Sequence, residues 1–411
     1  MWIIHGKYYD LTKFIDKHPG GKDILLKTKN VGDISALFES YHAFSNIEKI
    51  KSTLKNFEIN LSFEDKLYIN YDFTNYHILV DKIKQEYPNK NFIKANNFLF
   101  IRAFIEFILY LYFFYNCINS QLVYIKYIYA FISGMLWMSL GFVIMHDASH
   151  YALSSNPKIN NILSKGWNSW SLWINNIWFF HHVYSHHSFT GDKNKDPDIL
   201  HFRPFAKKVD HDPGLETKIF IPYQHKLISF ISIIFPGTFL GQTIIYFTSI
   251  LNYKLWQISL PKIKYYDFYD VIMCMIKIKL LYQAGFMTAF IYYISLNLFY
   301  HINVVGDHDT FETTVINHYD GIDWLKIQIC NSGNFSTQNK IWTYLFGGIN
   351  YQIEHHLFPN ICHIHYPAIS KYVKEYCKEN NIPYVDQPTL YDAYMSFLKM
   401  MKYHSKIKNI N

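Results

Sequence analysis

The sequence predicts a multi-domain protein, with a small α+β unit first and an all-α membrane domain after it. Four long apolar segments predict four transmembrane helices. Three histidine clusters lie just outside these segments and predict a helical cap that carries them on one face, the cytosolic one. A short mixed region around the motif His18-Pro-Gly-Gly predicts the first unit.

The first unit is expected over residues 1–60. Asp10 and Thr12 open a short helical stretch over residues 11–17, the run Pro19-Gly20-Gly21 ends it, and residues 22–29 are helical again. Residues 61–97 are predicted to form a linker and an amphipathic segment. The membrane domain is expected over residues 98–375, and residues 376–411 as a C-terminal cytosolic tail.

The four spans are predicted over about residues 98–117, 123–145, 227–251 and 280–300. The connection after residue 117 is short, so the first two spans form a hairpin. A lysine-bearing loop, residues 252–279, separates the other two. With an even number of spans before each histidine cluster, all three clusters fall on one side of the membrane. The lysines of the loop then lie on the far side, against the usual excess of positive charge in cytosolic loops.

Between the two pairs, residues 156–180 carry four tryptophans interrupted by Asn and Ser. Because tryptophan prefers the membrane–water interface, this stretch is predicted to form interfacial helices.

Charge and cysteine content narrow the class of partner. The net charge of +7 is modest and the lysines are dispersed, which favours an anionic membrane surface or an acidic redox partner over nucleic acid. The five cysteines form no CxxC pair, which argues against a disulfide framework and a zinc–thiolate site.

The histidine clusters point to a metal centre. His146 and His150 are four residues apart and project from one face of a helix, and His182 and His186 repeat this spacing. The full set exceeds the three or four ligands of a zinc site, so two metal ions fit better. An all-nitrogen site without cysteine clusters suits dioxygen activation by non-haem iron. The set comprises His146, His150, His182, His186, His187, His355 and His356, with His181 as a structural or supporting member.

The motifs HxxxH, HxxxHH and QxxHH, in this order, resemble those of the membrane fatty acyl desaturases. The glutamine that opens the third motif, Gln352, resembles the front-end subgroup, which inserts double bonds between an existing one and the carboxyl end. The run from Thr190 to Asp198 is also similar to that subgroup. The resemblance covers about residues 95–375.

This resemblance implies a di-iron centre with two non-haem Fe ions. Its ligands would be the seven histidines of the three motifs, with Gln352 where other desaturases have a histidine. His308, four residues before Glu312, matches a further ligand and competes with His301 for that role. Asn334 matches a position that reaches a metal through water. Residues expected to orient the ligands are Asp147, Asp196, Asp198 and Glu312.

The N-terminal unit is similar to the cytochrome b5 haem domain. The His-Pro-Gly-Gly motif begins at His18, His42 follows 24 residues later, and Tyr9-Asp10-Leu11 precedes both. The resemblance implies haem b with His18 and His42 as its axial ligands. Ligation by two histidines leaves no open position, so such a haem transfers electrons.

Together the two resemblances imply a front-end acyl-lipid or acyl-CoA desaturase in the endoplasmic reticulum membrane, with O2 as co-substrate. Electrons would pass from NADH through NADH-cytochrome b5 reductase to the fused haem domain on the cytosolic face. The acyl carrier stays open between CoA, phospholipid and sphingolipid. The alternatives are a sphingolipid desaturase, a fatty acid hydroxylase, and a membrane-tethered b5 electron carrier with an inactive desaturase half.

Overall fold

The computed structural model describes residues 1–61, 69–87, 93–192, 194–200, 221–234, 254–255, 258–259, 265–314 and 316–405. Its N-terminal part combines a three-stranded antiparallel sheet with short helices. The strands are β1 (Trp2–Ile4), β2 (Lys7–Tyr9) and β3 (Glu58–Ile59), in the order β1-β2-β3. The helices are η1 (Thr12–Lys17), α1 (Lys22–Thr28), α2 (Ser35–His42) and α3 (Ile47–Lys55). This agrees with the mixed unit and with the two short helices predicted there.

Helix α4 (Thr74–Glu86) joins this part to the rest. Its buried residues Tyr76, Leu79, Val80 and Ile83 follow the i, i+3, i+4, i+7 pattern of an amphipathic helix. They pack against α15 (Trp324–Cys330), α17 (Gln352–Leu357) and α18 (Tyr366–Glu379), the last preceded by η8 (His363–His365). The linker helix therefore contacts the segment that carries the third histidine motif.

A buried carboxylate ties α2 to α4. Glu39 accepts hydrogen bonds from His5 and from His77, both at 2.8 Å. Burial raises the pKa of Glu39, but the hydrogen bonds from the two imidazoles outweigh it and lower the pKa to about 2. The stabilisation is therefore complete above the ordinary value of 4.5 and is lost as the pH falls towards 2.

We expect Glu39→Gln to destabilise the full chain by about 1–2 kcal/mol at neutral pH, because it replaces charge-assisted hydrogen bonds by neutral ones. The melting temperature of wild type and variant, followed by the loss of haem absorbance, measures this. The difference should shrink as the pH falls below about 4.5. A difference that stays constant over this range would contradict the assignment.

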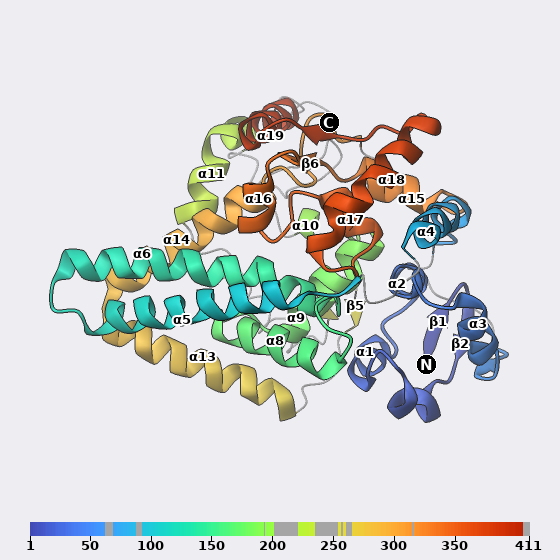
Figure 1. Cartoon of the computed structure of the whole chain (residues 1–411), viewed down its shortest axis with the longest axis horizontal. Helices are drawn as coiled ribbons and strands as arrows, with labels where there is room; N and C mark the ends of the chain where they lie inside the picture. The colour runs from blue at the N-terminus through green and yellow to red at the C-terminus, as the bar shows by residue number, and fades with distance from the viewer. Residues whose placement is uncertain are drawn as a thin grey trace.

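Long helices extend to one side of the molecule. In Figure 1, α5 (Asn97–Asn119), α6 (Val123–Leu140) and α13 (Tyr265–Ala284) run alongside one another on the left, away from the N-terminal part. Helix α6 packs against α5 and against α14 (Phe286–Val304). Gly134 permits the second contact, because a Cβ there would overlap Ser295 Oγ and the backbone of Tyr292. Among the described residues, the segments Asn97–Asn119 and Val123–Ser149 are long and apolar enough to cross a membrane.

The segment expected as a lysine-bearing loop is largely helical. Residues 265–279 belong to α13, and a turn at Gly285 leads into α14, so the predicted start of the fourth span, residue 280, lies inside α13. Lys277 is fully buried and donates hydrogen bonds to the hydroxyls of Tyr110 at 2.9 Å and Tyr292 at 3.0 Å. This lysine is therefore an interior residue of the helix bundle. Its charge says nothing about which side of a membrane a loop occupies.

The tryptophan-rich stretch is helical and partly buried. It forms α8 (Pro157–Trp170) and α9 (Asn175–Trp178), after η3 (Gly141–His146) and α7 (Asp147–Ser149). Trp167 and Trp173 are buried, and Trp167 stacks on Trp137 with ring centroids 5.7 Å apart. Core packing explains these two tryptophans, and the interfacial position expected of the stretch stays a prediction.

The predicted third span lies partly outside the described residues: residues 227–234 belong to α11 (Gln224–Ile234), and residues 235–251 are not described. Helix α11 packs on α14 and on α19 (Leu390–Ser405). The expected tail thus contains a packed helix, and its strand β7 (Asp386–Gln387) pairs in parallel with β6 (Asn334–Phe335). The remaining elements are η4 (Phe179–His186), α10 (Pro197–Leu200), η6 (Ile221–Tyr223), β4 (Lys254–Leu255), β5 (Ile258–Ser259) and α16 (Lys340–Leu345).

Candidate metal centre

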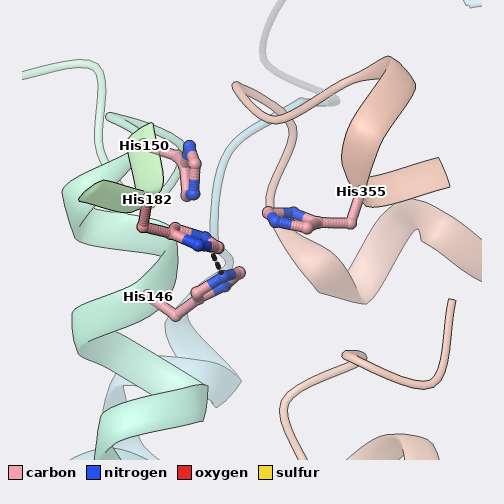
Figure 2. Close-up of side chains that lie close together, drawn as sticks. All are labelled: His146, His150, His182 and His355. Carbon is pink, nitrogen blue, oxygen red and sulfur yellow. Dashed lines mark hydrogen bonds between the residues drawn. The ribbon is translucent and has the colours of Figure 1, made fainter. Parts of the chain in front are cut away.

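Two π-helical stretches place the first two histidine motifs. The stretch η3 ends at His146, and η4 ends at His186. A π-turn carries one residue more per hydrogen bond than an α-turn and is frequent at functional sites. Helix α17 carries the third motif from the opposite side. Figure 2 shows the ring of His355 pointing from α17 towards the rings of His146, His150 and His182.

These four histidines form the first group. Each offers a ring nitrogen, and the four nitrogens lie within 4.8 Å of one another. His146 Nε2 and His182 Nε2 are 3.0 Å apart, and the ring centroids of His146 and His355 are separated by 4.4 Å. All four rings are buried. The arrangement brings nitrogen donors from three distant segments to one point.

A second group lies beside the first. It consists of His186, His308 and His356, with His186 Nε2 and His308 Nε2 separated by 3.2 Å. His187 adjoins both groups, because its ring stacks on His356 at 4.3 Å and it also forms a cluster with His355 and His356. Two adjacent groups of this size match two metal ions better than one.

The outward ring nitrogens are held by hydrogen bonds. His186 Nδ1 bonds to Asp196 at 3.0 Å, His356 Nδ1 to Gln328 at 3.0 Å, and His308 Nδ1 to the carbonyl of Asn331 at 2.8 Å. His355 Nδ1 lies 3.2 Å from the hydroxyl of Tyr366, and His150 Nδ1 lies 2.7 Å from that of Tyr41. A bond at Nδ1 fixes the tautomer that leaves the Nε2 lone pair free for a metal.

The inward nitrogens fit this role. In the part of the chain that the structure describes, Nε2 of His150, His355 and His356 has no hydrogen-bond partner, although each is buried. Burial, reinforced by the neighbouring imidazoles, lowers the pKa of His355 and His356 well below the usual value. Both rings are therefore neutral at pH 7, which is the form that binds iron and other transition metals.

The structure separates the two competing histidines. His308 lies in the second group, where Gln352 Nε2 is 2.8 Å from His308 Nε2. His301 lies elsewhere, with Nε2 3.2 Å from Ser229 Oγ and its ring close to Tyr394. Gln352 and His308 thus lie together in the cluster, and His301 does not reach it.

We expect His308→Ala to lower catalytic turnover by more than about 100-fold, above the usual range for residues that only orient a ligand. His301→Ala is the matched control and should retain activity and metal. Product formation and non-haem iron content per chain measure both effects. Greater loss in the His301 variant would transfer the ligand role to that residue.

Three residues expected at the centre have other partners. Asn334 donates to Glu354 at 2.8 Å and to the Tyr384 hydroxyl at 2.6 Å, and its oxygen accepts from the Ile353 amide. The Asn334 side chain therefore supports α17, and its expected role as a ligand through water stays a prediction. Although burial raises the pKa of Glu354 to about 7, the hydrogen bonds from Asn334 and Tyr384 favour its charged form.

The other two are acidic. Asp147 accepts from His363, at 2.8 Å from Nδ1, and so anchors the segment after α17 instead of a motif histidine. Glu312 is exposed and accepts hydrogen bonds from Gln387 and Ser396 near the C-terminus. Asp198 is the remaining acidic candidate: it bonds His181 at 2.7 Å and lies 3.4 Å from His186. His181 is thus in a supporting position.

Sequence reasoning missed several residues at the centre. Gln328, Tyr366 and Tyr41 each contact a cluster histidine from a distant segment, and no local pattern marks them. Trp178 stacks on His182 with centroids 4.4 Å apart. It precedes His182 by four residues, so helical spacing was a usable signal for this contact alone.

The N-terminal part holds a second pair of facing imidazoles. The ring centroids of His18 and His42 are 6.3 Å apart. His18 Nδ1 bonds to the carbonyl of Gly21 at 3.0 Å, and His42 Nδ1 to that of Phe38 at 2.8 Å. Burial lowers the pKa of His42 to about 4, with the bond to Phe38 opposing it, so the ring is neutral. Because metal–imidazole bonds are about 2 Å long, one metal ion fits between the two rings.

A glycine makes room for this pair. A Cβ at Gly20 would lie 2.8 Å from Cε1 of His18, closer than real contacts allow. The His-Pro-Gly-Gly turn therefore presents an unobstructed imidazole, which fits the axial ligand of a haem.

Comparison with known proteins agrees with both sites. The fatty acid desaturase family matches residues 122–388, and the cytochrome b5-like haem/steroid-binding domain matches residues 1–67. The chain is 24% identical to an acyl-lipid (8-3)-desaturase of Mortierella alpina, over 97% of this chain and 92% of that protein. It is 28% identical to one from Physcomitrium patens, over 97% and 87%.

A protein from Synechocystis matches a shorter part of the chain. It is an sn-1 linoleoyl-lipid 6-desaturase, 29% identical over 63% of this chain and 74% of its own length. A cytochrome b5-like domain implies haem, and the desaturase family implies iron and a lipid substrate. The chain belongs to the fatty acid desaturase family and carries a cytochrome b5-like domain fused at its N-terminal end.

Proposed function

We propose that this protein is a front-end acyl-lipid or acyl-CoA desaturase, which inserts a double bond on the carboxyl side of an existing one. The observation that carries the proposal is the convergence of eight histidines, seven of them buried, into two adjacent groups directly beside the haem-bearing unit. The relatives named (8-3)-desaturases, which match along nearly the whole chain, support the front-end position.

We assign one iron to each group. The first would be held by His146, His150, His182 and His355, and the second by His186, His308 and His356. His187 lies between them, and Gln352 adjoins His308. Asp196 and Gln328 orient ligand rings, and Asp198 lies 3.4 Å from Nδ1 of the ligand His186. When bound, the two irons supply an oxidant made from O2, which an unactivated C–H bond requires because no side-chain base can ionise it.

The protein's own residues supply orientation and exclusion of water. The cluster is buried, and its imidazoles are neutral before metal binds. Burial means that electrons must arrive through the protein, since a soluble reductant has no direct contact with the rings. The reaction consumes O2, two electrons and two protons, removes two hydrogens from adjacent carbons of the chain and releases two waters. His18 and His42 would hold the haem b that receives these electrons from NADH-cytochrome b5 reductase.

We further propose four membrane spans formed by α5, α6, α13 and α14. All four are long helices, α6 packs on α5 and α14, and α13 contacts both α5 and α14. Residues 235–251 of the expected span 227–251 lie outside the described residues, so that span is not tested, and the proposal takes α13 in its place because α13 contacts α5 and α14. The hairpins α5–α6 and α13–α14 would each begin and end on the same side of the membrane. The haem unit and the histidine cap would then both lie on that side, facing the cytosol of an endoplasmic reticulum membrane. The proposed division into residues 1–60, 61–97 and 98–375 follows the same boundaries as the sequence analysis.

Yeast expressing the chain and fed separately with several polyunsaturated acids tests the function. New double bonds in total lipid are located by mass spectrometry. A bond between the carboxyl end and an existing double bond is the expected result. A hydroxylated product would move the assignment to a hydroxylase, and a product on sphingoid chains alone would move it to a sphingolipid desaturase. If the expressed protein contains haem but makes no product, the result would favour a membrane-tethered b5 electron carrier with an inactive desaturase half.

A further inference from the structure

One hydrogen bond joins the haem-bearing helix to the metal cluster. Tyr41 is next to His42 at the end of α2, and its hydroxyl lies 2.7 Å from His150 Nδ1. His150 is fully buried and Tyr41 is partly buried, with ring planes 30° apart. The two residues are 109 positions apart in sequence, so the contact depends on how the two parts of the chain dock.

Independent contacts hold the two parts in this position. Asn360 donates to the carbonyl of Tyr41 at 2.8 Å, and Tyr184 donates to the carbonyl of Asp33 at 2.9 Å. Asn161 donates to Asp23 at 2.7 Å. Three separate segments of the desaturase part therefore bind the N-terminal part.

The docked parts also share hydrophobic cores. Ala36 and Ala43, at the two ends of α2, belong to the same core as Leu357 and Phe358 beside the third histidine motif. Leu25 of α1 shares a second core with Phe180 and Val183 of η4. Burial of apolar surface on both sides of α2 keeps the Tyr41 hydroxyl aimed at His150.

The chemistry of the contact follows from the nitrogen that faces the cluster. His150 Nε2 is aimed at the first histidine group and has no hydrogen-bond partner among the described residues. With its lone pair reserved for a metal, the ring carries its proton on Nδ1 and donates it to the Tyr41 oxygen. Tyr41 thus joins, through its own backbone and one hydrogen bond, a haem ligand to a ligand of the non-haem centre.

We propose that Tyr41 is a positioning residue that couples the haem to the non-haem centre, so that electrons enter through His42, Tyr41 and His150. The inference rests on the proposed function. Electrons couple better through covalent and hydrogen bonds than across van der Waals gaps, so the route through Tyr41 is favoured. Each passage oxidises one ferrous haem to ferric and reduces one ferric non-haem iron to ferrous. Two passages supply the two electrons of one turnover.

The test uses the full-length protein in detergent, with wild type compared to Tyr41→Phe and Tyr184→Phe. Each variant loses one hydroxyl that spans the interface between the two parts, but only Tyr41 ends on a cluster histidine. The protein is reduced anaerobically with dithionite and mixed with O2-saturated buffer, and the loss of ferrous haem is followed at the Soret band. The His186→Ala variant gives the background rate of direct oxidation by O2.

We expect wild type and Tyr184→Phe to show a fast phase above this background. In Tyr41→Phe that phase should slow by about 10- to 100-fold, the range for losing a ligand's hydrogen-bond partner, at unchanged haem and non-haem iron content. An unchanged fast phase would overturn the proposal. A fast phase whose amplitude decreases only in proportion to the non-haem iron lost from Tyr41→Phe would also overturn the proposal. Tyr41 would then only hold the His150 ring in place for metal binding. If the purified wild-type protein contains no non-haem iron, that result would instead refute the proposed function.

Discussion

Replacing His186 by alanine is expected to remove non-haem iron and abolish desaturation while the haem stays bound. His186 Nε2 faces His308 at 3.2 Å, and its Nδ1 is held by Asp196 at 3.0 Å. Its ring is therefore oriented into the second group and cannot be replaced by a neighbour. Activity should fall by more than about 100-fold, beyond the usual effect of losing a supporting residue.

Iron analysis, haem absorbance and product formation on the same preparation measure this. The haem signal is the internal control, because His18 and His42 belong to a separate site. Wild-type content of non-haem iron in the variant would contradict the assignment of His186, and so would retained turnover.

Replacing His42 by alanine is expected to abolish the Soret band and all NADH-driven turnover. His42 and His18 are the facing pair in the N-terminal unit, and with one removed the haem loses an axial ligand. Non-haem iron should remain, because no residue of the three histidine motifs is changed.

His5→Ala is the matched control, because His5 belongs to the same unit but binds Glu39 instead of facing His18. It should keep the Soret band. An unaltered haem spectrum in the His42 variant would show that the haem is bound elsewhere.

The histidine motifs were predictable because their spacing is local. The pairs that begin at His146 and His182 reappear in the structure as neighbours in the cluster. What spacing could not predict are the contacts between distant segments. Gln328, Tyr366 and Tyr41 reach the cluster only because α15, α18 and α2 pack around it, and packing between distant segments leaves no periodic trace in the sequence.

Helix α13 shows why the membrane segments were harder to predict. Asp270 and Lys277 make its sequence look like a polar loop, but both are fully buried. Lys277 is compensated by two tyrosine hydroxyls from α5 and α14, and Asp270 by Ser169 of α8. Buried polar groups are tolerated when they are hydrogen-bonded, and those partners are known only from the tertiary structure.

Two residue assignments made from sequence spacing show again that contacts between distant segments cannot be predicted from spacing. His301 lies in the last turn of α14 and His308 lies just after that helix, and only the fold shows that His308 reaches the cluster while His301 faces Ser229. Asn334 was chosen by its spacing alone, and the fold adds that its side chain donates to Glu354 and Tyr384.

The central claim is that one chain holds a haem and a separate non-haem centre of two irons. Determination of total iron and haem in the purified full-length protein tests it most directly. We expect three irons per chain, one in the haem and two at the two histidine groups. Iron equal to haem, in protein that retains its haem, would contradict the claim and leave an electron carrier.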